Sequence, residues 1–94
     1  MALVQASSTA WSTASGGVDI VQLLDVWNSV LLYNRSATQE LFYRADGVDP
    51  ITNGDNSKIC LPGEIVVVNM LSPSTPEVRI ISSLGIPYGV EGFT

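Results

Sequence analysis

The sequence predicts an all-β fold, a small antiparallel β-sandwich or jelly-roll-like barrel of about seven short strands with an extended N-terminal arm. Short runs of β-branched and aromatic residues recur from residue 18 to the end of the chain. Clusters of Asn, Asp, Gly, Pro and Ser separate these runs at the spacing of hairpin loops. No apolar pattern at helical spacing follows residue 33. Together these features favour strands over helices.

The length and composition predict one folded domain. The chain has 94 residues, of which 46% are hydrophobic, and its mean hydropathy is +0.30. We divide it into an N-terminal arm at residues 1–17 and a single β-sandwich domain at residues 18–94. Only 14% of the residues are charged, well below the fraction usual for a soluble domain. We therefore expect other protein to cover part of the surface.

The first 17 residues are rich in Ser, Thr and Ala and end in a glycine pair. Such a segment buries too little apolar surface to offset the entropy lost when its backbone is ordered. It is either a frayed terminus or an arm that becomes ordered against a neighbouring subunit. A lone large aromatic residue suits an anchor in a partner's pocket. We therefore take Trp11, together with Leu3 and Val4, as candidates for an interface with another subunit.

Residues 18–33 fit two kinds of secondary structure. Ile20, Leu23 and Leu24 recur at helical spacing, with polar residues between them. The run Val30–Tyr33 stands before a turn and is typical of a buried strand. We predict that residues 18–24 form a strand or one or two helical turns, and that residues 26–33 form a strand.

Three more strands are expected between residues 39 and 69, and the first of them forms a hairpin with the preceding strand. Gln39–Ala45 alternates apolar and polar residues, and the short loop Asn34–Thr38 separates it from the preceding strand, which fits a hairpin. Ser57–Leu61 is a short strand with its apolar residues on one face. After a Pro-Gly turn, Glu64–Asn69 holds the most β-prone run of the chain.

The C-terminal third predicts two more strands. The segment Ser72–Pro76 contains two prolines and is expected to break the preceding strand. Glu77–Ser83 follows, with Val78 and Ile80 on one face. Ile86–Gly92 then places its apolar residues on one side, as a half-buried strand requires.

The residues that most often do chemistry are scarce, so we expect no enzyme activity, no cofactor and no metal. The chain has no histidine, which removes the commonest general base and metal ligand. Its single cysteine, Cys60, is out of phase with Ile59 and Leu61 and has no histidine to activate it, so it is interpreted as structural or half-exposed. The nine carboxylates lie mostly in loops, where solvated surface charge is the ordinary explanation.

The loop between residues 46 and 56 is rich in oxygen ligands. It contains Asp46, Asp49, Asn53, Asp55 and Asn56, a composition that invites a calcium hypothesis. Counted from Asp49, however, an EF-hand would place an isoleucine at the third position and a cysteine at the twelfth. Turn formation explains the same residues better.

Two further patterns have an ordinary and a functional interpretation. The sequon Asn34-Arg35-Ser36 matters only in a secreted protein. The aromatic residues could line a sugar-binding face, although at strand spacing they are more often core or cross-strand pairs. The candidates for such a face are Trp11, Trp27, Tyr33, Phe42, Tyr43 and Tyr88.

The charge balance argues against two classes of partner. With a net charge of −5 and four scattered cations, the chain lacks the basic cluster that binds nucleic acid or anionic membranes. No apolar run is long enough to cross a bilayer, and the first residues lack the pattern of a secretory signal. We therefore expect synthesis in a cytoplasm.

The order of features from Trp27 to Gly92 resembles small structural proteins of tailed bacteriophages. In those proteins a strand ending in Asn precedes a polar turn and a strand ending in Asp-Gly, then an Asn-Gly loop, a Leu-Pro-Gly-Glu turn and a final apolar segment. The corresponding segments here are Val30–Asn34, Leu41–Gly47, Asn53–Gly54, Leu61–Glu64, Ile80–Ser83, Gly85 and Val90–Glu91. The likeness covers about three quarters of the chain and consists of turn residues and β-branched runs.

The resemblance implies a virion protein made in the host cytoplasm. It points to a head decoration, or cement, protein that binds and stabilises the capsid shell, and alternatively to a small neck, tail or fibre-base protein. Such proteins are usually homo-oligomers that contact the major capsid protein or other virion proteins. The resemblance carries over no catalytic residues. A carbohydrate-binding module remains the alternative that the aromatic residues suggest.

Overall fold

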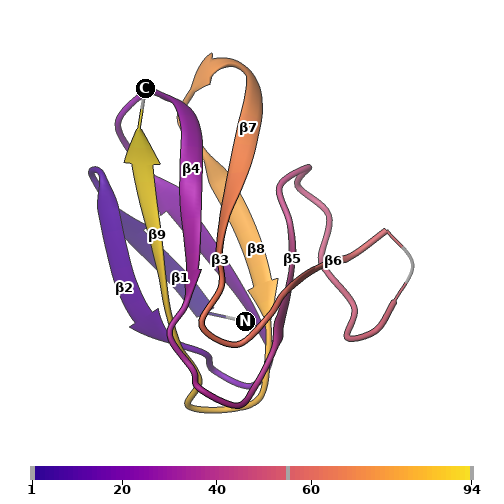
Figure 1. The fold of residues 1–94 in the computed structure, drawn as a ribbon. Helices are drawn as coiled ribbons and strands as arrows, with labels where there is room; N and C mark the ends of the chain where they lie inside the picture. Colours follow the sequence, from indigo (N-terminus) through magenta and orange to yellow (C-terminus); the bar gives the residue numbers. More distant parts are fainter. Residues whose placement is uncertain (1, 55, 94) are drawn as a thin grey trace.

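The computed structural model describes residues 2–54 and 56–93, which fold into two β-sheets packed face to face (Figure 1). The described residues contain no helix, and so none that could span a membrane. The strands are β1 (Ala2–Ala6), β2 (Thr9–Thr13), β3 (Val18–Leu23), β4 (Trp27–Asn34), β5 (Leu41–Arg44), β6 (Lys58–Cys60), β7 (Ile65–Ser74), β8 (Glu77–Ile81) and β9 (Pro87–Phe93). The all-β prediction is confirmed, but the described residues form nine strands rather than about seven.

The strands divide between a five-stranded sheet, in the order β1-β3-β8-β5-β6, and a four-stranded sheet, in the order β2-β9-β4-β7. The chain changes sheet at every connection except the one from β5 to β6. The predicted hairpin across Asn34–Thr38 is therefore wrong. β4 pairs with β7 and β9, whereas β5 pairs with β6 and β8. A short loop permits a hairpin but also permits a crossing between layers, and the sequence does not distinguish them.

The predicted N-terminal arm is also wrong, because its residues form strands of both sheets. β1 pairs with β3 in parallel, and β2 pairs with β9 antiparallel. Where the chain crosses between the sheets, the carbonyl of Ser7 accepts from the amide of Asp25 at 3.1 Å and that of Ser8 from Gly92 at 2.8 Å. Only small side chains here, such as Ala10 and Ala14, are fully buried. Backbone pairing, which composition does not reveal, holds this segment in place.

Residues 18–24, predicted as a strand or one or two helical turns, form a strand as far as Leu23, and the strand predicted at residues 26–33 is β4. Residues 18–23 form β3, in which Asp19, Val21 and Leu23 point inward by strict alternation.

The expected break at Ser72–Pro76 is wrong in part, because β7 continues to Ser74. Its pairing with β4 is irregular there: Ser29 pairs with Asn69 and Trp27 with Ser74, so β7 advances five residues while β4 advances two. The extra residues accommodate Pro73 in an irregular edge strand.

The core lies between the sheets and receives side chains from both. Cys60 is part of it, and its neighbours Ile59 and Leu61 are exposed. The buried members of the core are Ala10, Ala14, Val21, Leu23, Val30, Leu32, Leu41, Tyr43, Cys60, Val78, Ile80, Tyr88 and Val90. The predicted inward residues of the last two strands are therefore confirmed.

Candidate functional site

On the outer face of the four-stranded sheet, one row of paired positions crosses all four strands and holds large side chains on three of them. In register, Trp11 of β2 lies beside Gly89 of β9, which lies beside Tyr33 of β4 and then Ile65 of β7. The neighbouring row places Leu31 beside Val67. We call the five apolar side chains of these rows the apolar face: Trp11, Leu31, Tyr33, Ile65 and Val67. Three of them are more than half exposed, with Trp11 at 52% and both Ile65 and Val67 at 55%. Exposed apolar residues gathered in this way mark contact surfaces more often than single ones do.

A glycine allows Trp11 to lie flat on the sheet. A Cβ atom on Gly89 would come within 1.9 Å of the indole ring, so any larger residue there would displace the ring. The ring centroids of Trp11 and Tyr33 are 5.2 Å apart, and the guanidinium carbon of Arg35 lies 5.2 Å from the indole centroid. Tilted aromatic pairs and cation–π contacts at these distances are attractive. Trp11 is thus a rigid, half-exposed group.

Hydrogen bonds order the polar groups of the same face. The hydroxyl of Tyr33 donates to the carboxylate of Glu91 at 2.9 Å, and this hydrogen bond raises the pKa of Tyr33. The hydroxyl of Ser29 donates to the amide oxygen of Asn69 at 2.8 Å. These contacts hold the side chains around the apolar face in fixed rotamers, so less entropy is lost when a partner binds.

The three residues predicted as an interface do not form one surface. Trp11 belongs to the apolar face, whereas Leu3 is 60% exposed and pairs with Ile20 on the outer side of the five-stranded sheet. Val4 pairs with Val21 and packs against the core. Sequence reasoning missed Ile65 and Val67. An unbroken run of β-branched residues does not show which of them face outward, and this run lacked the polar alternation that would have shown it.

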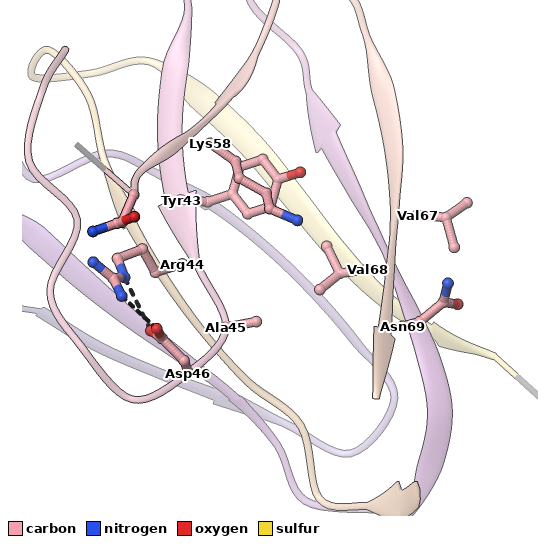
Figure 2. Close-up of a pocket in the computed structure, with 9 residues that line it drawn as sticks. Tyr43, Arg44, Ala45, Asp46, Lys58, Val67, Val68 and Asn69 are labelled. Carbon is pink, nitrogen blue, oxygen red and sulfur yellow. Dashed lines mark hydrogen bonds and ion pairs between the residues drawn. The ribbon is translucent and has the colours of Figure 1, made fainter. Parts of the chain in front are cut away.

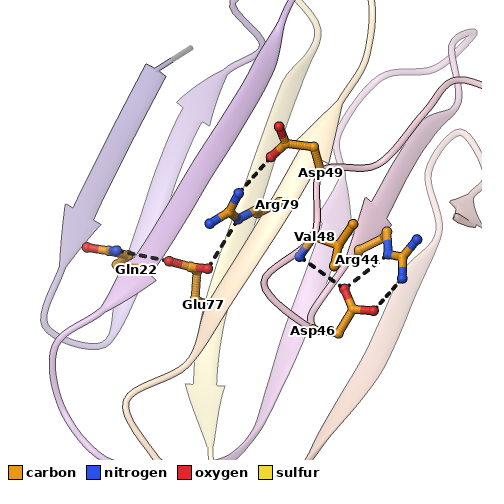
Figure 3. A network of polar contacts seen from close by, with 7 residues as sticks. All are labelled: Gln22, Arg44, Asp46, Val48, Asp49, Glu77 and Arg79. Atoms are coloured by element: carbon orange, nitrogen blue, oxygen red, sulfur yellow. Dashed lines mark hydrogen bonds and ion pairs between the residues drawn. The ribbon is translucent and has the colours of Figure 1, made fainter.

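The outer face of the five-stranded sheet carries a polar network on its strands β3 and β8 (Figure 3), beside an apolar row formed by Val18, Ile81, Phe42 and Ile59. Glu77 accepts from the amide nitrogen of Gln22 at 3.0 Å and from Nε of Arg79 at 3.2 Å. Arg79 also binds Asp49 at 2.7 Å, which ties the loop between β5 and β6 to this sheet. Exposed ion pairs of this kind contribute little to stability. They solvate the part of this face around Glu77 and Arg79.

The loop between β5 and β6 forms turns, as predicted. Gly47, Asn53 and Asn56 have positive φ angles of 79°, 54° and 64°. Arg44 forms an ion pair with Asp46, and its hydrogen bonds hold the pKa of that carboxyl at about 2. No group of three His, Cys, Asp or Glu residues among the described positions could hold a metal ion. Asp55, which the calcium hypothesis also used, lies outside the described residues.

A groove of about 360 Å³ opens between the β5–β6 pair and β7 (Figure 2). Tyr43, Arg44 and Lys58 line one side, and residues 67–69 of β7 line the other, with the side chain of Val68 directed toward Tyr43 (Figure 2). Arg44 is engaged by Asp46, and the groove brings together no pair of groups placed for acid–base or nucleophilic chemistry. The groove shows that the two sheets are not closed against each other along β7.

The sequon is part of the folded framework. Asn34 is 3% exposed, and its side-chain nitrogen donates to the carbonyls of Gln39 at 2.8 Å and Cys60 at 3.0 Å. Its side-chain oxygen accepts from the amide of Ser36 at 3.0 Å. A buried amide with these bonds cannot accept a glycan, so Asn34 has a structural role in the folded chain.

Burial excludes one aromatic residue from a sugar-binding face and restricts the access of another. Tyr88 is fully buried, and its hydroxyl donates to Asp19 at 2.9 Å across the sandwich. Asp19, itself 1% exposed, also accepts from the hydroxyl of Ser15. Trp27 is partly buried against Gly92, where a Cβ atom would lie 2.5 Å from the indole. Trp11 is therefore the indole that the sheet surface presents.

Burial also determines the state of Cys60. The side chain is completely buried, and its thiol donates weakly to the carbonyl of Glu64 at 3.4 Å. Burial raises the pKa of Cys60 to about 11. Reactive cysteines have a lowered pKa and access to solvent, and Cys60 has neither. Of the two interpretations from the sequence, the structural one is thus supported, and the half-exposed one is wrong because Cys60, not Ile59 or Leu61, points into the core.

Alkaline pH is expected to destabilise the chain. Burial raises the pKa of Cys60 to about 11 and also raises the pKa of Tyr43 and Tyr88. The unfolded chain releases these protons at lower pH than the folded chain does. The stability they provide is therefore complete below about pH 8.5, the ordinary thiol pKa, and is lost as the pH rises through the folded pKa values.

We expect the free energy of unfolding to fall by on the order of 2 kcal/mol between about pH 8 and pH 11. Urea titrations at a series of pH values measure this. The Cys60→Ala variant, which lacks the first of the titrating groups, should keep a flatter curve below about pH 10. A stability that does not change over this range would contradict the prediction.

Comparison with known proteins adds no relative to this picture. No protein-family model matches the chain, and no curated protein is significantly similar to it in sequence.

Proposed function

We propose that the chain is a non-enzymatic structural component of a phage virion, a head decoration protein that binds and stabilises the capsid shell. The observation that carries the proposal is the apolar face. It crosses a whole sheet, is more than half exposed at Trp11, Ile65 and Val67, and is held rigid by its neighbours. A chain with 14% charged residues that keeps such a surface exposed is suited to binding other protein.

The strand order supports this proposal. The strands β2 to β9 form the sheets β2-β9-β4-β7 and β3-β8-β5-β6, which is the order of an eight-stranded jelly roll, with β1 added beside β3. Jelly rolls build viral capsid proteins, but also lectins and cupins. The architecture therefore favours a virion protein by analogy, while the apolar face specifies protein–protein contact.

The shape of the face favours a protein partner over a small molecule. The groove beside it lies between β7 and the β5–β6 pair, whereas the exposed apolar side chains stand on the sheet surface. A large aromatic residue held in place among smaller apolar ones is the usual centre of a protein interface. Trp11, supported by Gly89 and Arg35, fits that role. The partner we propose is the major capsid protein, with a neck, tail or fibre-base protein as the alternative.

The test uses the major capsid protein encoded nearest to the gene for this chain. Both proteins are mixed after the shells have assembled, and the shells are sedimented. We expect the full chain to sediment with the shells, and Trp11→Ser to weaken this binding about thirtyfold, the effect of removing a central aromatic anchor.

Two further variants locate the contact. Leu24→Ser removes a side chain that is 55% exposed outside the apolar face and should leave binding unchanged. Leu3→Ser tests the outer side of the five-stranded sheet. The proposal would be contradicted if the chain does not sediment with the shells, or if Leu3→Ser abolishes binding and Trp11→Ser does not. Thermal unfolding of each variant shows that it is folded.

A carbohydrate-binding module is the second candidate, and one observation favours it. The half-exposed indole of Trp11 has the guanidinium of Arg35 beside it, and the carboxylate of Glu91 lies in the next row. Sugars bind where an aromatic ring stands among hydrogen-bonding groups. Binding to a glycan array that disappears with Trp11→Ala would support this candidate. An array without signal would exclude it and leave the assembly function.

A further inference from the structure

The strand β7 is a long sheet edge that is hydrogen-bonded along one side. Among the described residues it pairs with β4 and with no other strand, and it stands at the end of the four-stranded sheet. An exposed edge presents a row of unpaired backbone groups that can pair with a further strand. Such edges recognise extended partners by adding a strand to the sheet.

The register shows which backbone groups face outward. The amide of Asn34 donates to the carbonyl of Glu64 at 2.9 Å, so Glu64 exchanges hydrogen bonds with β4. In an antiparallel pair these positions alternate, so Val66 and Val68 also direct their backbone groups to β4. The amides and carbonyls of Ile65, Val67 and Asn69 therefore point away from the sheet. The apolar side chains of the first two stand on the apolar face.

The chain itself closes the opposite side of the sandwich and leaves this side open. On the opposite side, β1 and β2 are joined by two residues whose carbonyls bind the ends of both sheets. Beside β7 lies the groove of about 360 Å³. The inward side chains Val66, Val68 and Met70 pack against the core but are only partly buried. A strand added to β7 would cover them further.

The first half of this edge, residues 65–69, lacks the features that usually prevent pairing. Natural edges are short, charged, covered, or interrupted by proline or a β-bulge. In β7, Pro73 and the irregular pairing with β4 lie beyond Asn69. Within the described residues, β6 has three residues and begins with Lys58, and β1 and β2 have five residues each. β7 spans ten residues and contains no Asp, Glu, Lys or Arg. Pairing between two β7 strands therefore brings no carboxylates together, despite the net charge of −5.

We propose that β7 pairs antiparallel with β7 of a second copy of this chain, around a two-fold axis at Val67. The axis places Val67 opposite its copy and Ile65 opposite Asn69 of the second copy. The outward amides and carbonyls of these residues then satisfy one another, as an isologous interface requires. Leu31 and Val67 of the two copies form one apolar strip, and the two four-stranded sheets become a single continuous sheet. This dimer deepens the assembly function proposed above and rests on it.

The first test measures the mass of the full chain by analytical ultracentrifugation. We expect twice the monomer mass of 10.0 kDa. Val67→Lys places two ammonium groups opposite each other and should raise the dissociation constant of the dimer by on the order of a hundredfold. Thr9→Lys adds the same charge to the same outer face, at the far edge strand β2, and should leave the dimer intact. A monomeric chain, or a dimer that Val67→Lys does not weaken, would overturn the inference.

Cysteine cross-linking tests the register. Val67→Cys should form disulfide-linked dimers on mild oxidation, because paired Cα atoms on neighbouring strands lie within disulfide range. Ile65→Cys alone should cross-link poorly, but should cross-link when mixed with Asn69→Cys. The native Cys60 is buried and does not compete. Strong cross-linking of Ile65→Cys to itself would overturn the two-fold axis at Val67.

The dimer and the proposed function can fail separately. A dimer that depends on Val67 but does not sediment with capsid shells would overturn the virion function and leave the edge pairing established. Shell binding by a chain that stays monomeric would do the reverse. Cross-linking of Val67→Cys to a capsid subunit rather than to itself would show that another protein supplies the added strand, which would also overturn the dimer.

Discussion

Replacing Asn34 by aspartate is expected to lower the free energy of unfolding by about 4 kcal/mol. The side-chain nitrogen of Asn34 donates to the carbonyls of Gln39 and Cys60. Aspartate has nearly the same shape but offers an oxygen there, so the buried carbonyl of Cys60 and the partly buried carbonyl of Gln39 lose their donor and face a buried negative charge. Domains of this size are stable by roughly 5–14 kcal/mol, so much of the fold's stability would be lost.

Urea unfolding of the variant and the native chain measures this effect. Asn28→Asp makes the same chemical change at an exposed position of β4 and should cost less than about 0.5 kcal/mol. Acid should partly restore Asn34→Asp, because a protonated carboxyl can again donate one hydrogen bond. The stability of this variant should therefore rise as the pH falls from about 7 to 5. Equal stabilities for the two variants would contradict the role assigned to Asn34.

Replacing Tyr88 by phenylalanine is expected to cost about 3 kcal/mol of stability. Its hydroxyl donates to the buried carboxylate of Asp19, and removing it leaves that carboxylate with fewer donors in the core. Chemical denaturation measures the loss. In a chain of this length each kcal/mol lowers the midpoint of thermal unfolding by roughly 4–8 °C, so we expect this midpoint to fall by at least about 10 °C.

Tyr33→Phe is the matched control for this change. It also removes a hydroxyl bound to a carboxylate, but the Tyr33–Glu91 pair lies on the outer face of the sheet, where water can replace the lost bond. We expect a loss of less than about 1 kcal/mol. If Tyr88→Phe and Tyr33→Phe were equally stable, the Asp19–Tyr88 bond would not contribute as the structure implies.

Both large effects come from hydrogen bonds that join the two sheets. Asn34 lies on β4 and reaches the carbonyl of Cys60 on β6, and Tyr88 on β9 reaches Asp19 on β3. Apolar packing between sheets is non-directional, whereas these bonds require one relative position of the layers. These hydrogen bonds hold the four-stranded sheet in a defined position on the five-stranded sheet. The rigidity of the apolar face depends on that support.

Much of the secondary structure could be predicted from the sequence because strand and turn signals are local. Alternation located β5, β8 and β9 and identified inward residues such as Val78, Ile80 and Tyr88. Asn and Gly located the turns of the loop between β5 and β6, where positive φ angles are needed. The same local signals failed for residues 2–13. That segment is held by backbone pairing with β3 and β9, and composition carries little information about such pairing.

The candidate site was harder to predict because it is formed across strands. Trp11 was recognised as an anchor, but the residues that complete the apolar face are far away in the sequence. Tyr33 and Ile65 join Trp11 only through the order β2-β9-β4-β7. Leu3 is only eight positions from Trp11 in the chain, yet the two residues belong to different sheets. Neighbours in sequence therefore suggested an interface that the fold divides between two sheets.

The sequence by itself determined the all-β class, the turns and the scarcity of catalytic groups, because these follow from residue types and short-range periodicity. Only the tertiary structure decided which strands are neighbours, which face of each strand is outward, and which edge is left open. Those properties depend on long-range pairing, in which the backbone groups of every residue type except proline take part in the same way. The apolar face and the open edge of β7 are products of that long-range pairing, and the proposed function depends on them.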